Sequence, residues 1–267
     1  MTDSHEAFGM VDYLNSTGAG PTEAEIEFVM AYLKPGPMDP AILARLTNAE
    51  LMAAREVMVA ERRARDWAQL GQYRDANAAL AGHSVKAVFI GDSITEFWAA
   101  ADPDFFSNGV VGRGISGQTS PQILLRFMAD VIALKPQVVH IVCGSNDLAG
   151  NTGPSTPQDY KNNILAMLTL AQVHGIKIVI GSIPPAGNFP WLAKADFDPR
   201  PRLAELNAWL KNLSAERGLV WADYHAILRA DDDSMRAEYA RDGVHPGINA
   251  YALMKRVAQT ALAAALG

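Results

Sequence analysis

A serine hydroxyl stands where the sequence predicts the end of a buried strand, in the run from Phe89 to Ser93. Ligands bind at the carboxyl edge of open α/β sheets, so Ser93 is placed where a nucleophile could meet a substrate. The position also suits a helix N-cap, because a serine side chain accepts hydrogen bonds from the first N–H groups of a helix. The second glycine of the Gly-x-Ser-x-Gly elbow of α/β-hydrolases is missing. Taken alone, Ser93 leaves both interpretations open.

A carboxylate and an imidazole lie three residues apart near the C-terminus, as Asp242 and His245. A carboxylate bound to one ring nitrogen of a histidine fixes its tautomer and leaves the other nitrogen free to accept a proton. A surface aspartate followed by a helix-capping histidine would show the same spacing. The pair therefore indicates a general base only if other catalytic groups accompany it.

Two further loops carry hydrogen-bond donors. The stretch from Gly112 to Thr119 contains three glycines, whose backbone N–H groups could approach an anion or simply form a turn. Asn146 follows the apolar run that ends at Val142, and a side-chain amide there could donate to a developing oxyanion. Asn-Asp before a glycine-rich loop is also ordinary turn chemistry.

The elements that must position these residues alternate between short β-branched runs and longer amphipathic stretches. Strands are predicted at 86–90, 109–111, 138–142, 177–180 and 219–221, with helices at 121–133, 157–174, 200–217 and 248–265. Strands that alternate with helices and lack hairpin turns predict a parallel sheet covered on both faces. We therefore expect an α/β domain over residues 81–267.

Residues 1–80 differ from the rest of the chain. After a polar stretch, they show helical spacing from Glu23 to Lys34 and a Thr-x-x-Glu capping pattern at Thr47 that opens a long helix through Arg65. We expect a helical N-terminal extension that packs on the domain, forms part of the pocket wall or makes homodimer contacts. Its apolar side chains require a partner surface.

Composition excludes several classes of protein. Hydrophobic residues make up 49% and charged residues 19%, which is typical of a globular chain, and the net charge of −6 disfavours nucleic acid as a partner. No apolar run approaches the ~20 residues of a membrane span. A single cysteine and histidines without ligand spacing predict no disulfide and no metal. The N-terminus lacks a secretory leader, so we expect a cytoplasmic protein, or a periplasmic or secreted one if a leader had been removed.

Together, the four groups occur in an order that resembles the SGNH hydrolases, also called the GDSL esterase/lipase family, over about residues 86–265. The resemblance implies a flavodoxin-like three-layer α/β/α sandwich with a five-stranded parallel sheet and no cofactor. It implies a catalytic triad of Ser93, His245 and Asp242. It further implies an oxyanion hole of the Ser93 and Gly117 backbone N–H groups and the Asn146 amide, with Gly117 favoured over Gly114.

The substrate is less well defined by the sequence. Aromatic side chains near the predicted sheet edge could stack on a sugar or enclose an acyl group, although local packing would explain them equally well; they are Phe97, Trp98, Phe189 and Trp191. We expect a carboxylic ester hydrolase that acts through an acyl-enzyme on short-acyl or O-acetyl esters of small molecules or saccharides. An acyltransferase, a lysophospholipase or a thioesterase with the same triad is the alternative, and a non-catalytic binding module is the third reading.

Overall fold

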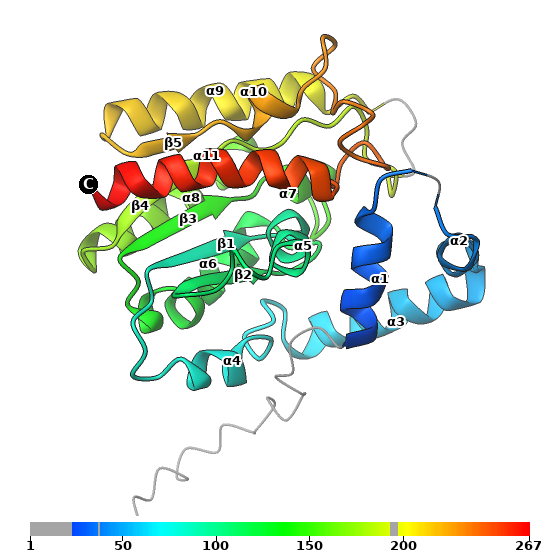
Figure 1. Ribbon diagram of the computed structural model, residues 1–267, viewed down its shortest axis with the longest axis horizontal. Coiled ribbons are helices and arrows are strands. Elements are labelled where there is room, and N and C mark those ends of the chain that lie inside the picture. Colours follow the sequence, from blue (N-terminus) through cyan, green and yellow to red (C-terminus); the bar gives the residue numbers. More distant parts are fainter. Residues whose placement is uncertain (1–22, 37, 193–196) are drawn as a thin grey trace, which may run out of the picture.

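The computed structural model describes residues 23–36, 38–192 and 197–267. At its centre lies a five-stranded sheet in which every strand pairs in parallel, in the order β2-β1-β3-β4-β5 (Figure 1). The strands are β1 (Ala87–Gly91), β2 (Val110–Gly114), β3 (Val138–Val142), β4 (Lys177–Gly181) and β5 (Val220–Ala222). This strand order is that of flavodoxin-like sheets, which confirms the predicted fold class.

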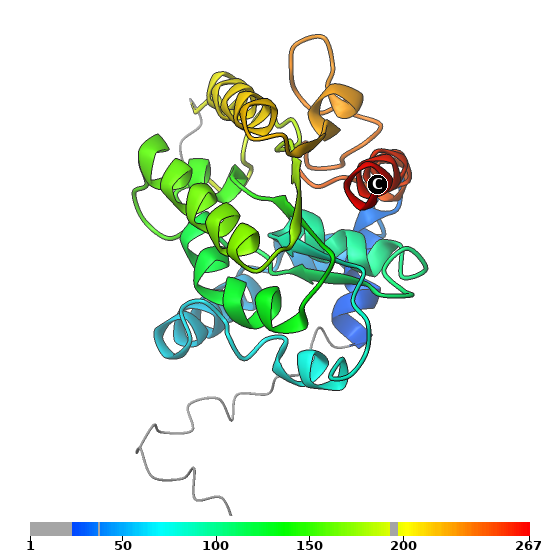
Figure 2. The ribbon, with the colours of Figure 1, turned by 90° about the vertical axis from the view of Figure 1, so that its left-hand side faces the viewer.

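Helices cover both faces of the sheet (Figure 2). On β1, Val88 and Ile90 join the core on one face, whereas Ala87 and Phe89 join the core on the other. A strand covered on both sides is apolar at every position, and this explains its continuous hydrophobic run. The first core includes α6 (Ser120–Asp130), α8 (Pro157–Val173) and α9 (Arg200–Glu216), and the second includes α5 (Ser93–Ala101), α10 (Tyr224–Leu228) and α11 (Ile248–Leu266).

The second strand extends further than its sequence predicts. It was expected to end at Val111 but continues to Gly114, which pairs with Gly91 of β1. A Cβ on Gly114 would lie 2.1 Å from the backbone nitrogen of Glu96, so this glycine permits close packing of α5 on the strand. The first half of the predicted glycine loop is therefore strand.

Several short helices were not predicted, and one long helix is divided. The predicted helix at 121–133 consists of α6 and a separate 3₁₀ turn, η1 (Ile132–Leu134). Loops between the main elements contain α7 (Ser145–Ala149) as well as α10. Both are five residues long, too short for hydrophobic periodicity to identify.

The N-terminal extension contains four helices in the described residues (Figure 1). They are α1 (Glu23–Leu33), α2 (Pro40–Thr47), α3 (Ala49–Arg65) and α4 (Arg74–Ala79). The N-cap of α3 is Asn48, which accepts from the Leu51 N–H, rather than the predicted Thr47. Residues 1–22 of the predicted extension lie outside the described residues.

Hydrogen bonds attach the extension to the sheet domain. The Tyr73 hydroxyl donates to the Gly114 carbonyl, and the Gln118 side chain donates to the Ala68 carbonyl over 2.8 Å. Helix α1 packs against α5 at the carboxyl edge of the sheet. On α3, by contrast, Val57 is 59% exposed. The homodimer contact expected of the extension stays a prediction.

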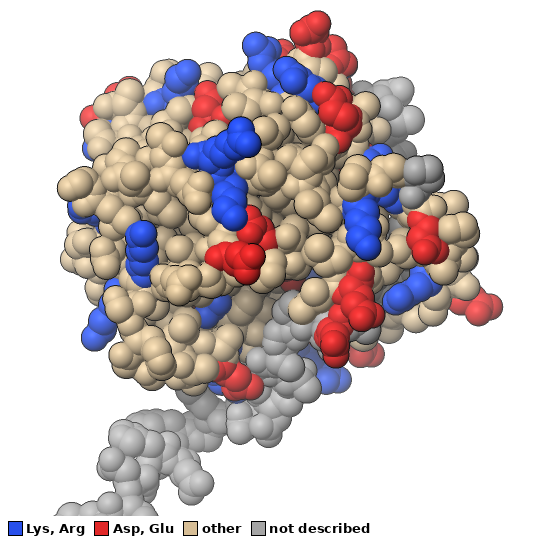
Figure 3. Space-filling model, in the orientation of Figure 1, with Lys and Arg blue, Asp and Glu red and all other residues tan. Residues whose placement is uncertain are grey.

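Two surface features bear on possible partners. Among the described residues, no helix combines the length and the apolar character that a bilayer crossing requires. On the face shown in Figure 3, acidic and basic side chains are interspersed.

Candidate functional site

Ser93 is the first residue of α5, directly after β1, and it is only 7% exposed. The N-cap of this helix is Asp92, whose Oδ1 accepts from the Ile94 N–H over 3.0 Å. Asp92 thus takes the capping role that the sequence left open for Ser93. A Cβ on Gly91 would lie 2.3 Å from Thr95 Oγ1 and 2.4 Å from the Val142 carbonyl oxygen. A glycine is therefore required for the sharp turn that presents Ser93.

His245 and Asp242 lie in the segment before α11, and the structure brings both to Ser93. The Ser93 Oγ is 2.9 Å from His245 Nε2, and His245 Nδ1 is 2.6 Å from Asp242 Oδ2. An ionised carboxylate only accepts hydrogen bonds, so the ring proton lies on Nδ1 and Nε2 is free to accept from the Ser93 hydroxyl. The three predicted triad residues are therefore connected in the order that proton transfer requires.

The Asp242 carboxylate is held by donors on both oxygens. Oδ1 accepts from the backbone N–H groups of Val244 (2.9 Å) and His245 (2.8 Å), and Oδ2 accepts from His245 and from the Tyr32 hydroxyl (2.6 Å). Burial by itself would raise the pKa of Asp242. The hydrogen bonds and charge of His245, together with the Tyr32 hydrogen bond, outweigh burial, so the pKa of Asp242 lies well below its usual range. Asp242 is therefore ionised at neutral pH.

Asn146 lies in α7, directly after β3, and it is 4% exposed. Its Nδ2 donates to the Gln118 carbonyl over 3.0 Å and lies 3.3 Å from Asp92 Oδ2. Gly117 precedes Gln118 and has a φ of 75°, a backbone conformation that favours glycine. The structure therefore brings the predicted amide and the predicted glycine loop together beside the turn that carries Ser93.

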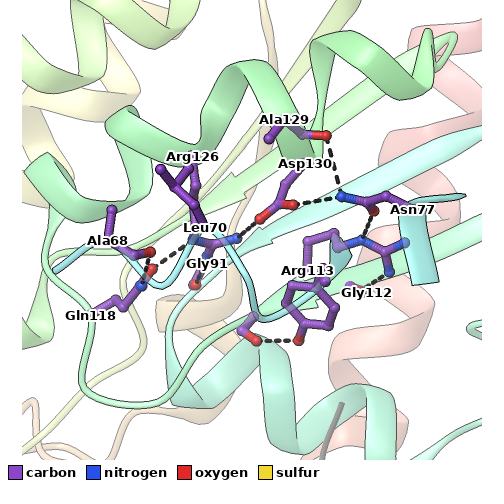
Figure 4. Close-up of polar contacts among 12 residues, drawn as sticks. Ala68, Leu70, Asn77, Gly91, Gly112, Arg113, Gln118, Arg126, Ala129 and Asp130 are labelled. Atoms are coloured by element: carbon purple, nitrogen blue, oxygen red, sulfur yellow. Dashed lines mark hydrogen bonds and ion pairs between the residues drawn. The ribbon is translucent and has the colours of Figure 1, made fainter. Parts of the chain in front are cut away.

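A buried arginine holds the loop and the strand end in place (Figure 4). Arg126, on α6, donates to the Gly91 carbonyl (2.8 Å), to Gln118 Oε1 (2.6 Å) and to Asp130 Oδ2 (2.9 Å). Its side chain and that of Asp130 are 0% and 1% exposed. Gly91 and Gln118 flank the predicted site, so Arg126 fixes the spacing between the nucleophile turn and the glycine loop.

Burial changes the proton affinity of two carboxyls next to the site. Burial is the main cause of the raised pKa of Asp92, which is about 6. Backbone hydrogen bonds and the charge of His245 lower this pKa but do not outweigh burial. Burial likewise raises the pKa of Asp147 to about 6, although Ser120 donates to it from its backbone and its hydroxyl. Asp147 thus anchors the start of α6 through Ser120.

Asn151 is a residue of the site that the sequence did not single out. Its Nδ2 donates to Asn146 Oδ1 over 2.7 Å, and its Oδ1 accepts from Trp191 Nε1 over 3.1 Å. Its backbone carbonyl accepts from Arg63 Nη1 of α3 over 3.1 Å. Asn151 therefore links the amide of the site to an aromatic side chain and to the N-terminal extension.

The four aromatic residues predicted at the site divide between two places. The rings of Phe97 and Trp191 lie 5.1 Å and 6.0 Å from that of His245, centroid to centroid. Phe189 is buried and stacks on Trp191 at 5.2 Å, so it supports the exposed ring from below.

Trp98 is a correction to the predicted set of substrate contacts. It is 1% exposed and stacks on Phe105 and Tyr251 in the core beneath α11. Trp98 follows Ile94 by four residues and shares its buried helix face, whereas Phe97 follows Ser93 by four and shares the face of the site. Its position gives Trp98 no access to a substrate.

A cavity of about 520 Å³ borders His245 between the end of α1 and the segment at 237–241. Tyr32 and Gly36 line it from the extension, and Glu238 lines it from the domain. Ser93 does not line this cavity, so it lies beside the histidine rather than over the nucleophile. Within the described ranges, no three His, Cys, Asp or Glu side chains gather closely enough to hold a metal ion.

Comparison with known proteins places this chain in a family. Residues 89–253, more than half of the chain, match the GDSL-like Lipase/Acylhydrolase family. The chain therefore belongs to this family, whose members are hydrolases that act on esters. The family resemblance inferred from the four sequence blocks is confirmed.

Solved structures agree with this assignment. A protein from Bacteroides fragilis assigned as an acylhydrolase is 38% identical, with a TM-score of 0.72 over 76% of this chain and 99% of that one. A GDSL-like lipase from Bacteroides thetaiotaomicron is 37% identical, with a TM-score of 0.71 over 74% and 98% of the two chains. An acetylxylan esterase from Geobacillus stearothermophilus shares the fold at 21% identity and a TM-score of 0.55, over 67% and 94%.

A sequence relative matches a shorter stretch. The lipoprotein YqeF of Bacillus subtilis is 32% identical over 79 residues, which make up 28% of this chain and 32% of that protein. The chain thus spans about a third of the length of this relative.

Proposed function

We propose that this protein is a serine esterase that cleaves short-acyl or O-acetyl esters through an acyl-enzyme on Ser93. The observation that carries the proposal is the continuous hydrogen-bonded chain from the Ser93 hydroxyl through the His245 ring to the Asp242 carboxylate, with steps of 2.9 and 2.6 Å. Both distances are within hydrogen-bond reach, which a nucleophile and its general base require.

The chemistry follows from the order of these groups. Ser93 Oγ attacks the ester carbonyl while His245 Nε2 takes the hydroxyl proton, and the resulting imidazolium is stabilised by Asp242. His245 then protonates the departing alcohol, which leaves the acyl group on Ser93. A water molecule, deprotonated by the same nitrogen, attacks the acyl-enzyme and releases the acid and the free serine.

The oxyanion formed in both steps requires donors that are already in place. Ser93 begins α5, and the first N–H groups of a helix have no intrahelical acceptor. The three donors are the backbone N–H of Ser93, the backbone N–H of Gly117 and one N–H of the Asn146 side chain. The Asn146 hydrogen becomes available when it gives up its 3.3 Å contact with Asp92. Each such donor contributes about 3 kcal/mol of transition-state stabilisation.

The preference for small acyl groups rests on the surroundings of His245. Phe97 and Trp191 stand close to its ring, and Trp191 is 42% exposed, which suits a flat face on which a sugar could stack. The acetylxylan esterase of similar fold acts on a saccharide ester, and this is compatible with the same class of substrate here.

Hydrolysis of p-nitrophenyl acetate, butyrate and decanoate at pH 7–8 by the wild type and by Ser93→Ala tests the proposal. We expect rates that fall with chain length and a loss of roughly 10⁴-fold or more in Ser93→Ala. Ser107→Ala is the matched control, since its hydroxyl bonds the Asp104 carbonyl before β2, at the other edge of the sheet. Equal rates in Ser93→Ala and the wild type would refute the serine mechanism.

An added alcohol or sugar acceptor in the same assay separates hydrolysis from acyl transfer. We expect free acid as the main product at every acceptor concentration. An acylated acceptor as the main product would make the protein an acyltransferase with the same triad.

A further inference from the structure

Helix α1 contributes a polar side chain to the Asp242–His245 pair from outside the region that matches the family, residues 89–253. The Tyr32 hydroxyl donates to Asp242 Oδ2 over 2.6 Å, although the two residues are 210 positions apart in sequence. Its ring and the His245 ring form a T-shaped pair, with the centroids 6.4 Å apart and the planes at 74°. Tyr32 therefore contacts both partners of the proton-relay pair.

Among the residues that the structure describes, the other donors to Asp242 come from its own loop. They are the backbone N–H groups of Val244 and His245 and the His245 ring. Tyr32 is the donor that ties this carboxylate to another part of the fold, and it shares Oδ2 with the histidine. The Tyr32 bond thus holds the carboxylate itself, and not only the loop backbone, in place relative to α1.

Helix α1 is itself fixed on both sides of the site. It packs against α5, the helix that begins with Ser93, and its Leu33 is buried in the core that lies under α5 and α11. Arg241, the neighbour of Asp242, donates to the carbonyls of Lys34 and Gly36 just after α1. Helix α1 thus spans the nucleophile helix and the loop that carries the base.

We propose that Tyr32 is a positioning residue of the hydrolytic site: it holds the Asp242 carboxylate in line with His245 and weakens the carboxylate as an acceptor for the histidine proton. This inference rests on the proposed function, since it assigns Tyr32 to the triad of that reaction. The hydroxyl of Tyr32 bonds Asp242 rather than Ser93, so it acts on the reaction through this carboxylate.

The direction of the effect follows from the shared oxygen. A donor on Oδ2 disperses part of the negative charge that would otherwise stabilise the His245 imidazolium. Removal of the Tyr32 hydroxyl leaves Oδ2 of Asp242 to the His245 ring. The ring should therefore bind its proton more tightly. The acidic limb of the rate profile, which reports protonation of the base, should then move to higher pH.

Other charged and titratable groups face this pair and stay unchanged in the test. They are Arg241 beside Asp242, Asp92 at the end of β1, Tyr251 of α11, and Lys34 and Glu238 at the cavity next to His245. A change confined to Tyr32 can therefore be assigned to its own hydroxyl.

The test compares Tyr32→Phe with Tyr73→Phe in the full chain, using p-nitrophenyl acetate from pH 5 to 9. Tyr73 is the matched control, because it also attaches the extension through a buried hydroxyl, but to the Gly114 carbonyl rather than to the triad. In Tyr32→Phe, we expect kcat to fall roughly three- to tenfold, KM to stay within about twofold, and the acidic limb of kcat/KM to rise by about 0.5 to 1 pH unit. Tyr73→Phe should leave the limb in place.

The outcomes separate this inference from the proposed function. An unchanged or lowered acidic limb in Tyr32→Phe, with Ser93→Ala inactive, overturns the role of Tyr32 and leaves the esterase standing. An equal shift in Tyr73→Phe also overturns it, because the cause would then be general loosening of the extension. Full activity of Ser93→Ala overturns both. Tyr32→Leu, which also loses the ring edge against His245, should show the same limb shift and a larger fall in kcat.

Discussion

Asn151 donates from its side-chain nitrogen to Asn146 Oδ1 over 2.7 Å, and this bond determines which end of the Asn146 amide faces the nucleophile turn. With the oxygen occupied by Asn151, the nitrogen of Asn146 points to the Gln118 carbonyl and to Asp92. The donor that the proposed oxyanion hole requires is thus oriented by a residue five positions further along the chain. Residues that orient a site in this way affect catalysis without contact with the substrate.

Asn151→Asp should therefore impair the reaction strongly. A carboxylate opposite Asn146 Oδ1 repels it and favours a flipped amide, whose oxygen would then face the developing oxyanion. We expect kcat for p-nitrophenyl acetate to fall by roughly 100-fold, which corresponds to the loss of one oxyanion donor. Asn151→Ala removes the orienting bond without repulsion and should cost less.

Asn162→Asp is the control for this change. Asn162 lies exposed on α8 and accepts from the Gln158 side chain, so the same change of charge is made away from the site. Its kcat should match the wild type. Equal activity of Asn151→Asp and Asn162→Asp would show that Asn151 does not orient the amide.

Asp242→Asn should be severely impaired, because of the way its loop holds the carboxylate. Oδ1 accepts from two backbone N–H groups, so the oxygen of an asparagine must occupy that place and its NH₂ must face His245. The ring would then accept at Nδ1 and carry its proton on Nε2, where it cannot take a proton from Ser93. We expect a loss of roughly 10⁴-fold in kcat, the size that this substitution causes in the serine protease triad.

Asp223→Asn provides the matched comparison for Asp242→Asn. Asp223 also accepts from a backbone N–H, that of Ala226, but it caps α10 in a partly exposed position. An asparagine caps a helix equally well, so activity should be retained. A loss below about tenfold in Asp242→Asn would contradict the tautomer argument.

The three residues of the proposed triad stand out in the sequence because each lies in a short local pattern at a strand end or helix start. Parallel strands bring their carboxyl ends to one edge of the sheet, so the alternation of elements already places Ser93 next to Asn146. Trp98 was misplaced because helix α5 was not predicted. With α5 assigned from Ser93, its period puts Phe97 on the face of the site and Trp98 on the core face.

Tyr32 and Asn151 could not be predicted, for two different physical reasons. Tyr32 meets Asp242 only through the docking of α1, a contact between distant segments that helical periodicity does not encode. Asn151 stands in a glycine-rich stretch where an asparagine is normal turn chemistry, so its residue type carries no signal. The buried Arg126 is likewise hidden in an amphipathic helix, where a basic residue is expected to face solvent.

Arg126→Met should destabilise the fold strongly. The change leaves Asp130 buried with the Asn77 amide as its remaining side-chain donor, and it leaves the Gly91 carbonyl without the guanidinium. Removal of one partner of a buried ion pair costs about 3–5 kcal/mol of unfolding free energy. Urea denaturation followed by circular dichroism measures this loss.

Arg229→Met is a control with the same sequence spacing. Arg229 also pairs with an aspartate four residues on, Asp233, but the two side chains are 50% and 48% exposed. An exposed pair contributes about 0–1 kcal/mol, so this variant should unfold close to the wild type. Similar losses in the two variants would contradict the importance of burial.

His140 on β3 should make a contribution to stability that is lost in acid, opposite in sign to those of Asp92 and Asp147, whose raised pKa values favour the folded state below about pH 6. This ring stacks on Phe89 at 4.2 Å and bonds the Tyr224 hydroxyl over 2.7 Å, and its burial lowers its pKa from 6.5 to about 3. Since the unfolded chain binds this proton below pH 6.5 and the folded chain does not, the stabilisation is complete above pH 6.5 and is lost as pH falls toward 3. The loss reaches about 4 kcal/mol by the lower limit. In His140→Gln, the slope of the unfolding free energy against pH between 4 and 6.5 should be less positive than in the wild type, whatever its absolute value. His174→Gln, a change at an exposed histidine, should keep the wild-type slope. Parallel slopes for His140→Gln and the wild type in urea titrations would mean that protonation of the buried ring makes no such contribution.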